Sequence, residues 1–95
     1  MDDRTRALRT CAFCPNTCRR HAPPELAVLP ESHTPSALCL LALERLQGRL
    51  PDDEATRALL AERRFVQAVQ PHCTYGLDVA ALLDAALAAP AGAAR

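Results

Sequence analysis

The chain lacks lysine and tryptophan, and its only aromatic residues are Phe13, Phe65 and Tyr75. So few rings offer little for base stacking, and the formal net charge of zero does not favour a nucleic-acid partner. The longest apolar run covers only residues 37–43, which is far too short to cross a bilayer. We therefore predict a soluble protein with no nucleic-acid partner and no membrane insertion.

The N-terminus also lacks the apolar segment of a secretory signal, because Met1–Arg4 leads into a polar, arginine-rich stretch. We expect a cytoplasmic protein, in which the five cysteines are reduced, and this favours metal binding over disulfides. The chain of 95 residues predicts a single domain over 1–90 and a flexible tail over 91–95. A core this small would gain stability from a metal that links distant segments.

Prolines, glycines and capping residues divide the chain into helical segments, and no stretch alternates long enough to form a strand. The sequence therefore predicts an all-α domain of three to five helices. The expected elements are a short or frayed helix over 1–10, a helical turn over 17–21 and an irregular connection over 22–30, followed by helices from Thr34 to about Gly48, from the segment 51–54 to Pro71, and from near Asp78 to Leu87.

Apolar spacing of three and four places one face of each long segment in the core. Thr34 and Asp78 are expected to cap helices, and Cys39 is expected to be a buried core thiol. The segment before Pro71 carries one apolar face interrupted only by Glu62, to which we assign no chemistry. The members of that face are Ala55, Ala58, Leu59, Phe65, Val66 and Val69.

Three cysteines, Cys11, Cys14 and Cys18, lie within eight residues, and Cys73 lies far downstream. A loop with C-x2-C spacing presents several sulfurs from one side, and bacterial ferredoxins combine such a run with a remote cysteine. We predict that these four cysteines bind one 4Fe-4S cluster, which would tie the N-terminus to the turn before the last helix. A zinc ion with four thiolate ligands favours the same spacing and is the alternative.

The order Cys11-x2-Cys14-x3-Cys18, then residues 31–35 opening an apolar helix, then residues 73–79 opening another, resembles the α-helical ferredoxin domains. These occur in the iron–sulfur subunits of heterodisulfide reductase, anaerobic glycerol-3-phosphate dehydrogenase, succinate dehydrogenase and fumarate reductase. The resemblance covers roughly residues 10–87. In that family two C-x2-C-x2-C-x3-C-P motifs bind two clusters, and the last cysteine of each motif serves the other cluster.

The chain departs from this pattern in a selective way. Residues 19–23 lack the fourth cysteine of the first motif, and residues 65–72 lack the three leading cysteines of the second. All four ligands of one cluster are therefore missing, whereas the resemblance assigns Cys73 to the N-terminal trio and so keeps the other set complete. Smaller departures are Pro-Ser-Ala over 35–37 in place of Pro-Arg-Gly, and three residues rather than two between Cys14 and Cys18.

The resemblance implies a helical-ferredoxin-like domain with one cluster, acting as an electron carrier or as a small electron-transfer subunit of a larger redox enzyme. Arginines surround the cysteine trio, where they would steer an acidic partner or offset the charge of the cluster. They are Arg4, Arg6, Arg9, Arg19 and Arg20. The alternative is an accessory subunit whose cluster, or four-cysteine zinc site, only stabilises the fold and partner docking.

The histidines near the cysteines each have two interpretations. His21 could complete a zinc site with three cysteines, but its position after two arginines favours a surface turn. His72 could donate a hydrogen bond to a sulfur, or it could be a solvated loop residue. Because His72 and Cys73 are neighbours whose side chains diverge, they do not form a nucleophile–base pair. We expect no independent catalytic activity.

Overall fold

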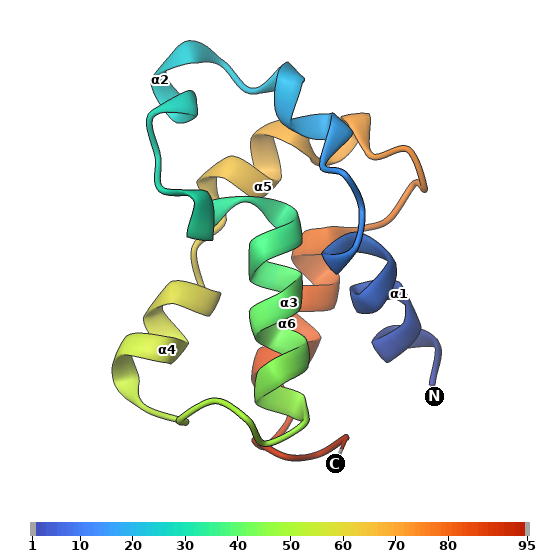
Figure 1. The fold of residues 1–95 in the computed structure, drawn as a ribbon, viewed down its shortest axis with the longest axis vertical. Helices are drawn as coiled ribbons and strands as arrows, with labels where there is room; N and C mark the ends of the chain where they lie inside the picture. Colours follow the sequence, from blue (N-terminus) through green and yellow to red (C-terminus); the bar gives the residue numbers. More distant parts are fainter. Residues whose placement is uncertain (1, 95) are drawn as a thin grey trace.

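The structure is a computed structural model that describes residues 2–94, and short loops connect its helices (Figure 1). The α-helices are α1 (Asp3–Ala12), α2 (Pro24–Ala27), α3 (Pro35–Leu46), α4 (Glu54–Leu60), α5 (Arg64–Val69) and α6 (Val79–Ala88), and the 3-10 helices are η1 (Thr17–His21), η2 (Glu31–His33) and η3 (Gln70–His72). No strand occurs between residues 2 and 94, so the predicted all-α fold class is confirmed.

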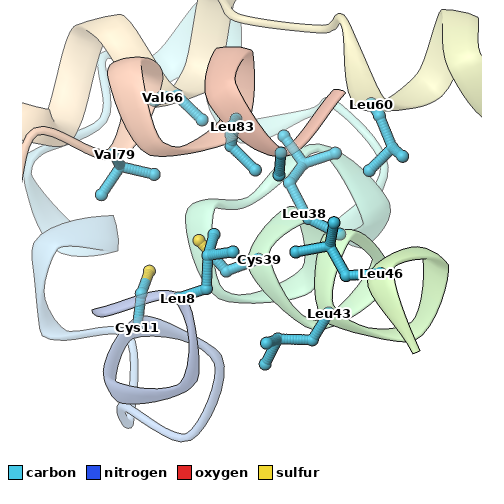
Figure 2. Packing of buried hydrophobic residues seen from close by; sticks show 12 residues of the cluster. Leu8, Cys11, Leu38, Cys39, Leu43, Leu46, Leu60, Val66, Val79 and Leu83 are labelled. Atoms are coloured by element: carbon cyan, nitrogen blue, oxygen red, sulfur yellow. The ribbon is translucent and has the colours of Figure 1, made fainter. Parts of the chain in front are cut away.

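Helix α3 lies at the centre of the fold, and α1 and α6 pack against it (Figure 1). Its buried face carries Leu38, Cys39 and Leu46, which meet Leu8 from α1 and Leu83 from α6 (Figure 2). Cys39 is fully buried, which confirms the prediction of a core thiol. None of the helices described combines the length and the apolar composition that crossing a membrane requires.

The two helices with the clearest sequence signals have nearly the predicted limits. Helix α3 begins at Pro35, and after it Gly48 takes a left-handed backbone conformation with φ of 77°. The Asp78 carboxylate accepts a hydrogen bond from the Ala81 amide at 3.1 Å and caps α6 as predicted. Thr34 is the N-cap residue of α3 as predicted, but its hydroxyl makes no capping bond to the helix amides and donates instead to the Glu31 carbonyl at 2.8 Å.

Helix α1 is more regular and extends further than the sequence predicted. Its N-cap is Asp2, whose carboxylate accepts from the Thr5 amide at 2.7 Å, and it continues to Ala12. Leu8 and Cys11 lie on its buried face. The first predicted ligand is therefore in the last turn of a helix and not in a loop, while the Met1 end of the expected segment lies outside the described residues.

The connection over 22–30 was expected to be irregular throughout, but it contains the single turn α2. Pro24 occupies the first helical position of this turn. An amide at this position has no helical acceptor, so proline loses no hydrogen bond there. The helical turn predicted over 17–21 is confirmed as η1.

The continuous helix predicted before Pro71 is wrong, because the chain breaks between α4 and α5 at residues 61–63. The Arg63 guanidinium donates to the Leu60 and Glu62 carbonyls at the end of α4. The Glu62 carboxylate accepts a hydrogen bond from the amide of Arg64, the first residue of α5, at 3.1 Å. Local side-chain bonds to the backbone thus replace the helical bonds that a continuous segment would make.

The break changes which residues of α4 face the core. Leu60 is buried, whereas Ala55 and Ala58, which were expected on the inner face, are exposed. Phe65 and Val66 on α5 are buried as predicted.

The last residues of the described chain lie against the C-terminal turn of α3. The Gly92 amide donates to the Arg45 carbonyl at 3.0 Å, and the Ala94 amide donates to the Leu46 carbonyl at 2.8 Å. Both amides belong to residues 91–95, which were expected to form a flexible tail. Arg95 itself lies outside the described residues. The Arg45 side chain is buried in the same place and donates to the carbonyls of Ala86 at 3.0 Å and Ala89 at 2.6 Å.

Candidate metal centre

Two segments far apart in sequence meet at one end of α3. The first, residues 11–21, leaves α1 and forms η1, and the second, residues 70–79, runs from η3 into α6 (Figure 1). The hydroxyls of Thr17 and Thr74 share a hydrogen bond of 3.1 Å. The rings of His21 and His72 stack with their centroids 3.8 Å apart and their planes 9° from parallel. The hydroxyl bond and the ring stack thus both join the two segments at this end of α3.

All four predicted ligands line one small hollow between these segments, with a volume of about 20 Å³. Cys11, Cys14 and Cys18 come from the first segment, and Cys73 comes from the second. The other lining residues are Asn16, Thr17, Pro35, Gln70, Thr74, Tyr75 and Val79. Among the described residues that line the hollow, none has a carboxylate, an imidazole or a positive charge. Its strongest metal-binding groups are therefore the four thiols.

Backbone amides donate to two of the sulfurs. The Asn16 amide lies 3.3 Å from the Cys14 Sγ, and the Leu77 amide lies 3.4 Å from the Cys73 Sγ. The Cys18 thiol donates to the Asn16 side-chain oxygen at 3.8 Å. Such amide donors stabilise negative charge on a sulfur, as a thiolate ligand requires.

Asn16, which was not predicted as a site residue, shapes the loop between the cysteines. It has a φ of 66° and is the sole non-glycine residue with positive φ in the described part of the chain. Asparagine tolerates this left-handed conformation better than most residues. The Pro15-Asn16 pair was the available signal, because this dipeptide is typical of tight turns.

The pKa values of the thiols reflect how closely they approach one another. Burial raises the pKa of Cys18, and the neighbouring Cys11, Cys14 and Cys73 raise it further, because negative charges on adjacent sulfurs oppose ionisation. A side-chain hydrogen bond from Cys39 lowers the pKa of Cys11. The same hydrogen bond, together with burial, raises the pKa of Cys39.

The donor atoms are not yet arranged as a ligand set. In the part of the chain that the structure describes, no three His, Cys, Asp or Glu side chains are placed so that they could hold a metal ion. The four sulfurs share a hollow, and ligation would require their side chains to turn toward a common centre. A set made only of thiols suits zinc or an iron–sulfur cluster and is poorly suited to magnesium or calcium.

The structure does not bring either histidine to the hollow. His21 and His72 are exposed and stack on each other, which is consistent with a surface position for both. Partial loss of hydration lowers the pKa of the exposed His21 imidazole, and the nearby His72 and Arg20 lower it further. The threonines beside Cys18 and Cys73 are the polar contacts that join the two segments, and no sequence pattern indicated this pairing.

One exposed aromatic ring lies at the hollow, because Tyr75 lines it and is 57% exposed. Phe13 is 70% exposed but lines a separate cavity with Arg9 and Leu40. The Arg9 guanidinium lies over the Phe13 ring, 5.9 Å from its centroid. Arg19 forms an ion pair with Glu31, so part of the predicted basic charge is offset within the chain.

No protein-family model matches the chain, and no curated protein or solved structure matches it either. The resemblance to α-helical ferredoxin domains therefore stays a prediction from the cysteine pattern and the order of the helices.

Proposed function

We propose that Cys11, Cys14, Cys18 and Cys73 bind one 4Fe-4S cluster, and that the protein is an electron carrier or a small electron-transfer subunit of a larger redox enzyme. One observation supports this proposal most directly: the four thiols line the same hollow although Cys18 and Cys73 are 55 positions apart. A run of three cysteines together with a remote fourth is a ligand arrangement that iron–sulfur proteins use.

The surroundings of the sulfurs are suited to thiolate ligands. The amides of Asn16 and Leu77 each donate to a sulfur, and such hydrogen bonds tune the reduction potential of a cluster. A bound cluster would supply a one-electron couple. The chain's own contribution is to fix the thiolates, to donate to them and to hold the two segments at a constant separation.

The position of the hollow favours exchange of electrons with a partner. Cys14, Cys18 and Cys73 are each partly exposed, so the site lies close to the protein surface. Tyr75 offers an exposed aromatic ring there, and the exposed Arg20 of η1 adds positive charge. We propose that a larger redox protein with an acidic, partly apolar face docks at this end of the molecule.

A structural zinc site is the second candidate, and the size of the hollow favours it. A volume of about 20 Å³ is close to the minimum that one water molecule occupies, so a single ion needs less rearrangement than an eight-atom cluster. Zinc with four thiolate ligands is a structural site that contributes directly to folding. In this case the metal would stabilise the contact between residues 11–18 and Cys73 and would support docking to a partner.

The identity of the bound metal distinguishes the 4Fe-4S cluster from the structural zinc site. The full chain, purified without oxygen, should be coloured and should contain iron and acid-labile sulfide in the proportions of a 4Fe-4S cluster. A colourless protein that contains zinc would contradict the cluster and support the second candidate.

Redox titration followed by electron paramagnetic resonance then tests electron transfer. A reversible one-electron couple is expected. A cluster that shows no reversible couple in the biological range would refute the carrier role and leave a structural role.

A further inference from the structure

A groove between α1 and α3 takes no part in the proposed metal site. The two helices pack side by side (Figure 1), and the groove has a volume of about 230 Å³. From α1 and its C-cap come Thr5, Arg9 and Phe13, whose spacing of four places them on one face. From α3 and the turn after it come Leu40, Leu43, Glu44, Gln47 and Arg49. The groove therefore follows both helices for about 12 Å, which is about two helical turns.

Two large apolar side chains at the groove are exposed to solvent. Phe13 is 70% exposed and Leu40 is 41% exposed, whereas Leu43, at the edge of the core cluster, is buried (Figure 2). Among the described residues, the other exposed large apolar side chains are Val28 and Tyr75, and neither lines the groove. Exposed apolar side chains that gather on one face are typical of an interaction surface.

The groove also carries one positive charge that the chain does not neutralise. The Arg49 guanidinium donates to both oxygens of the Glu44 carboxylate, at 2.6 and 2.9 Å, so these two charges offset each other. Arg9 is exposed, and its guanidinium lies over the Phe13 ring, 5.9 Å from the centroid. Among residues 2–94, no carboxylate forms an ion pair with Arg9. A partner complementary to this groove therefore combines an apolar surface with a negative charge.

We infer that the groove binds an amphipathic helix of a partner protein, whose apolar side chains cover Phe13 and Leu40 and whose acidic side chain pairs with Arg9. A helix fits because its apolar anchors, three, four and seven residues apart, match a groove two turns long between two other helices. A small molecule fits less well, since pockets for such ligands usually have roughly 300 Å³ or more. The inference goes beyond the proposed function, because it requires no metal.

Two synthetic helical peptides serve as probes of the groove. Each has about 18 residues, most of them alanine, and carries leucines three and four residues apart on one face. Glutamates flank the leucines in the first peptide, and lysines flank them in the second. Binding to the full chain is measured by the fluorescence anisotropy of a dye on each peptide. Because the formal net charge of the chain is zero, overall charge favours neither peptide.

The glutamate peptide should bind saturably, and the lysine peptide should bind at least about tenfold more weakly, because like charges meet at Arg9. Arg9→Glu should reverse this preference. Phe13→Ala should weaken the binding of both peptides about tenfold, because it removes the exposed ring.

Two matched controls change exposed side chains outside the groove. Arg4→Glu makes the same charge change on α1, and Val28→Ala removes an exposed apolar side chain next to α2. Both should bind the peptides as the wild type does. All four substituted positions are exposed, so we expect every variant to fold, which circular dichroism checks.

Four results would overturn the inference. Absence of saturable binding by either peptide would show that the groove does not accept a helix. Reversal of the charge preference in Arg4→Glu as well as in Arg9→Glu would assign that preference to net charge. Equal weakening by Val28→Ala and Phe13→Ala would place the bound peptide outside the groove. A dimer in sedimentation velocity that Arg9→Glu dissociates would make a second copy of the chain the occupant. Each result can be obtained whether the cysteines hold a cluster, zinc or no metal, so failure of the proposed function leaves this inference standing.

Discussion

Replacing Cys73 with serine should remove the link that a metal would make between the N-terminal cysteines and the segment before α6. A bridge between Cys18 and Cys73 closes a loop of 55 positions. The chain-entropy relation for a cross-link of this length gives about 4 kcal/mol of stabilisation. For a domain of this size, its loss lowers the thermal midpoint by roughly 16–32 °C.

The assay is thermal unfolding of the metal-loaded protein without oxygen, followed by far-ultraviolet circular dichroism. The scan rate is held fixed, because release of the metal makes unfolding irreversible. Cys14→Ser is the matched control: it also removes one ligand, but Cys11 and Cys18 still connect the first segment to Cys73. Its midpoint should fall less than that of Cys73→Ser.

Metal-free samples of the wild type and both variants provide a second control, and their midpoints should be similar because all three lack the bridge. Equal midpoints for loaded Cys73→Ser and loaded Cys14→Ser would refute closure of the long loop by the metal. Equal midpoints for loaded and metal-free wild type would refute a stabilising metal at this site.

Three further changes test the fold and the loop. Arg45→Met should lower the free energy of unfolding in urea by about 3 kcal/mol, because the carbonyls of Ala86 and Ala89 lose their buried hydrogen-bond donor. The control Arg49→Met removes an exposed guanidinium and should cost less than about 1 kcal/mol. Equal losses would contradict a special role for burial. Asn16→Ala should lower stability by about 1 kcal/mol and Asn16→Gly should not, since Asn16 has a φ of 66°; a loss with glycine would assign the effect to the side chain. The pKa of Asp53 is lowered by its bond to the Thr56 amide, so its contribution is present above the ordinary value of 3.8 and is lost as pH falls through the lower folded pKa. Unfolding measured between about pH 2 and 5 should therefore depend less on pH in Asp53→Asn than in the wild type, and identical pH profiles would refute this reasoning.

The sequence predicted those helices whose ends depend on one strong local signal. Pro35 and Gly48 bracket α3, and the Asp78 cap begins α6, because the backbone preferences of these residues act without tertiary contacts. The break between α4 and α5 could not be predicted in the same way. It depends on where the Arg63 and Glu62 side chains reach, and helical spacing alone does not determine this.

For the candidate site too, the sequence predicted what depends on local spacing and not what depends on contacts between helices. Spacing selected Cys11, Cys14, Cys18 and Cys73, and the structure brings all four to one hollow. The sequence did not predict that Cys11 belongs to a helix, because residues 1–10 have no clear apolar period. Cys11 belongs to the same core cluster as Cys39 of α3, and this packing between two helices is a property of the tertiary fold.

The buried Arg45 has a consequence for how the molecule would acquire a metal. It lies in the last turn of α3, and Pro35 at the other end of the helix lines the cysteine hollow. The two ends are about 15 Å apart along the helix axis. One end is closed by Arg45 and its carbonyl partners, which require no metal, so the helices can assemble first around this end. We expect any metal that the cysteines bind to enter at the opposite end of α3 from Arg45, after the helices have assembled.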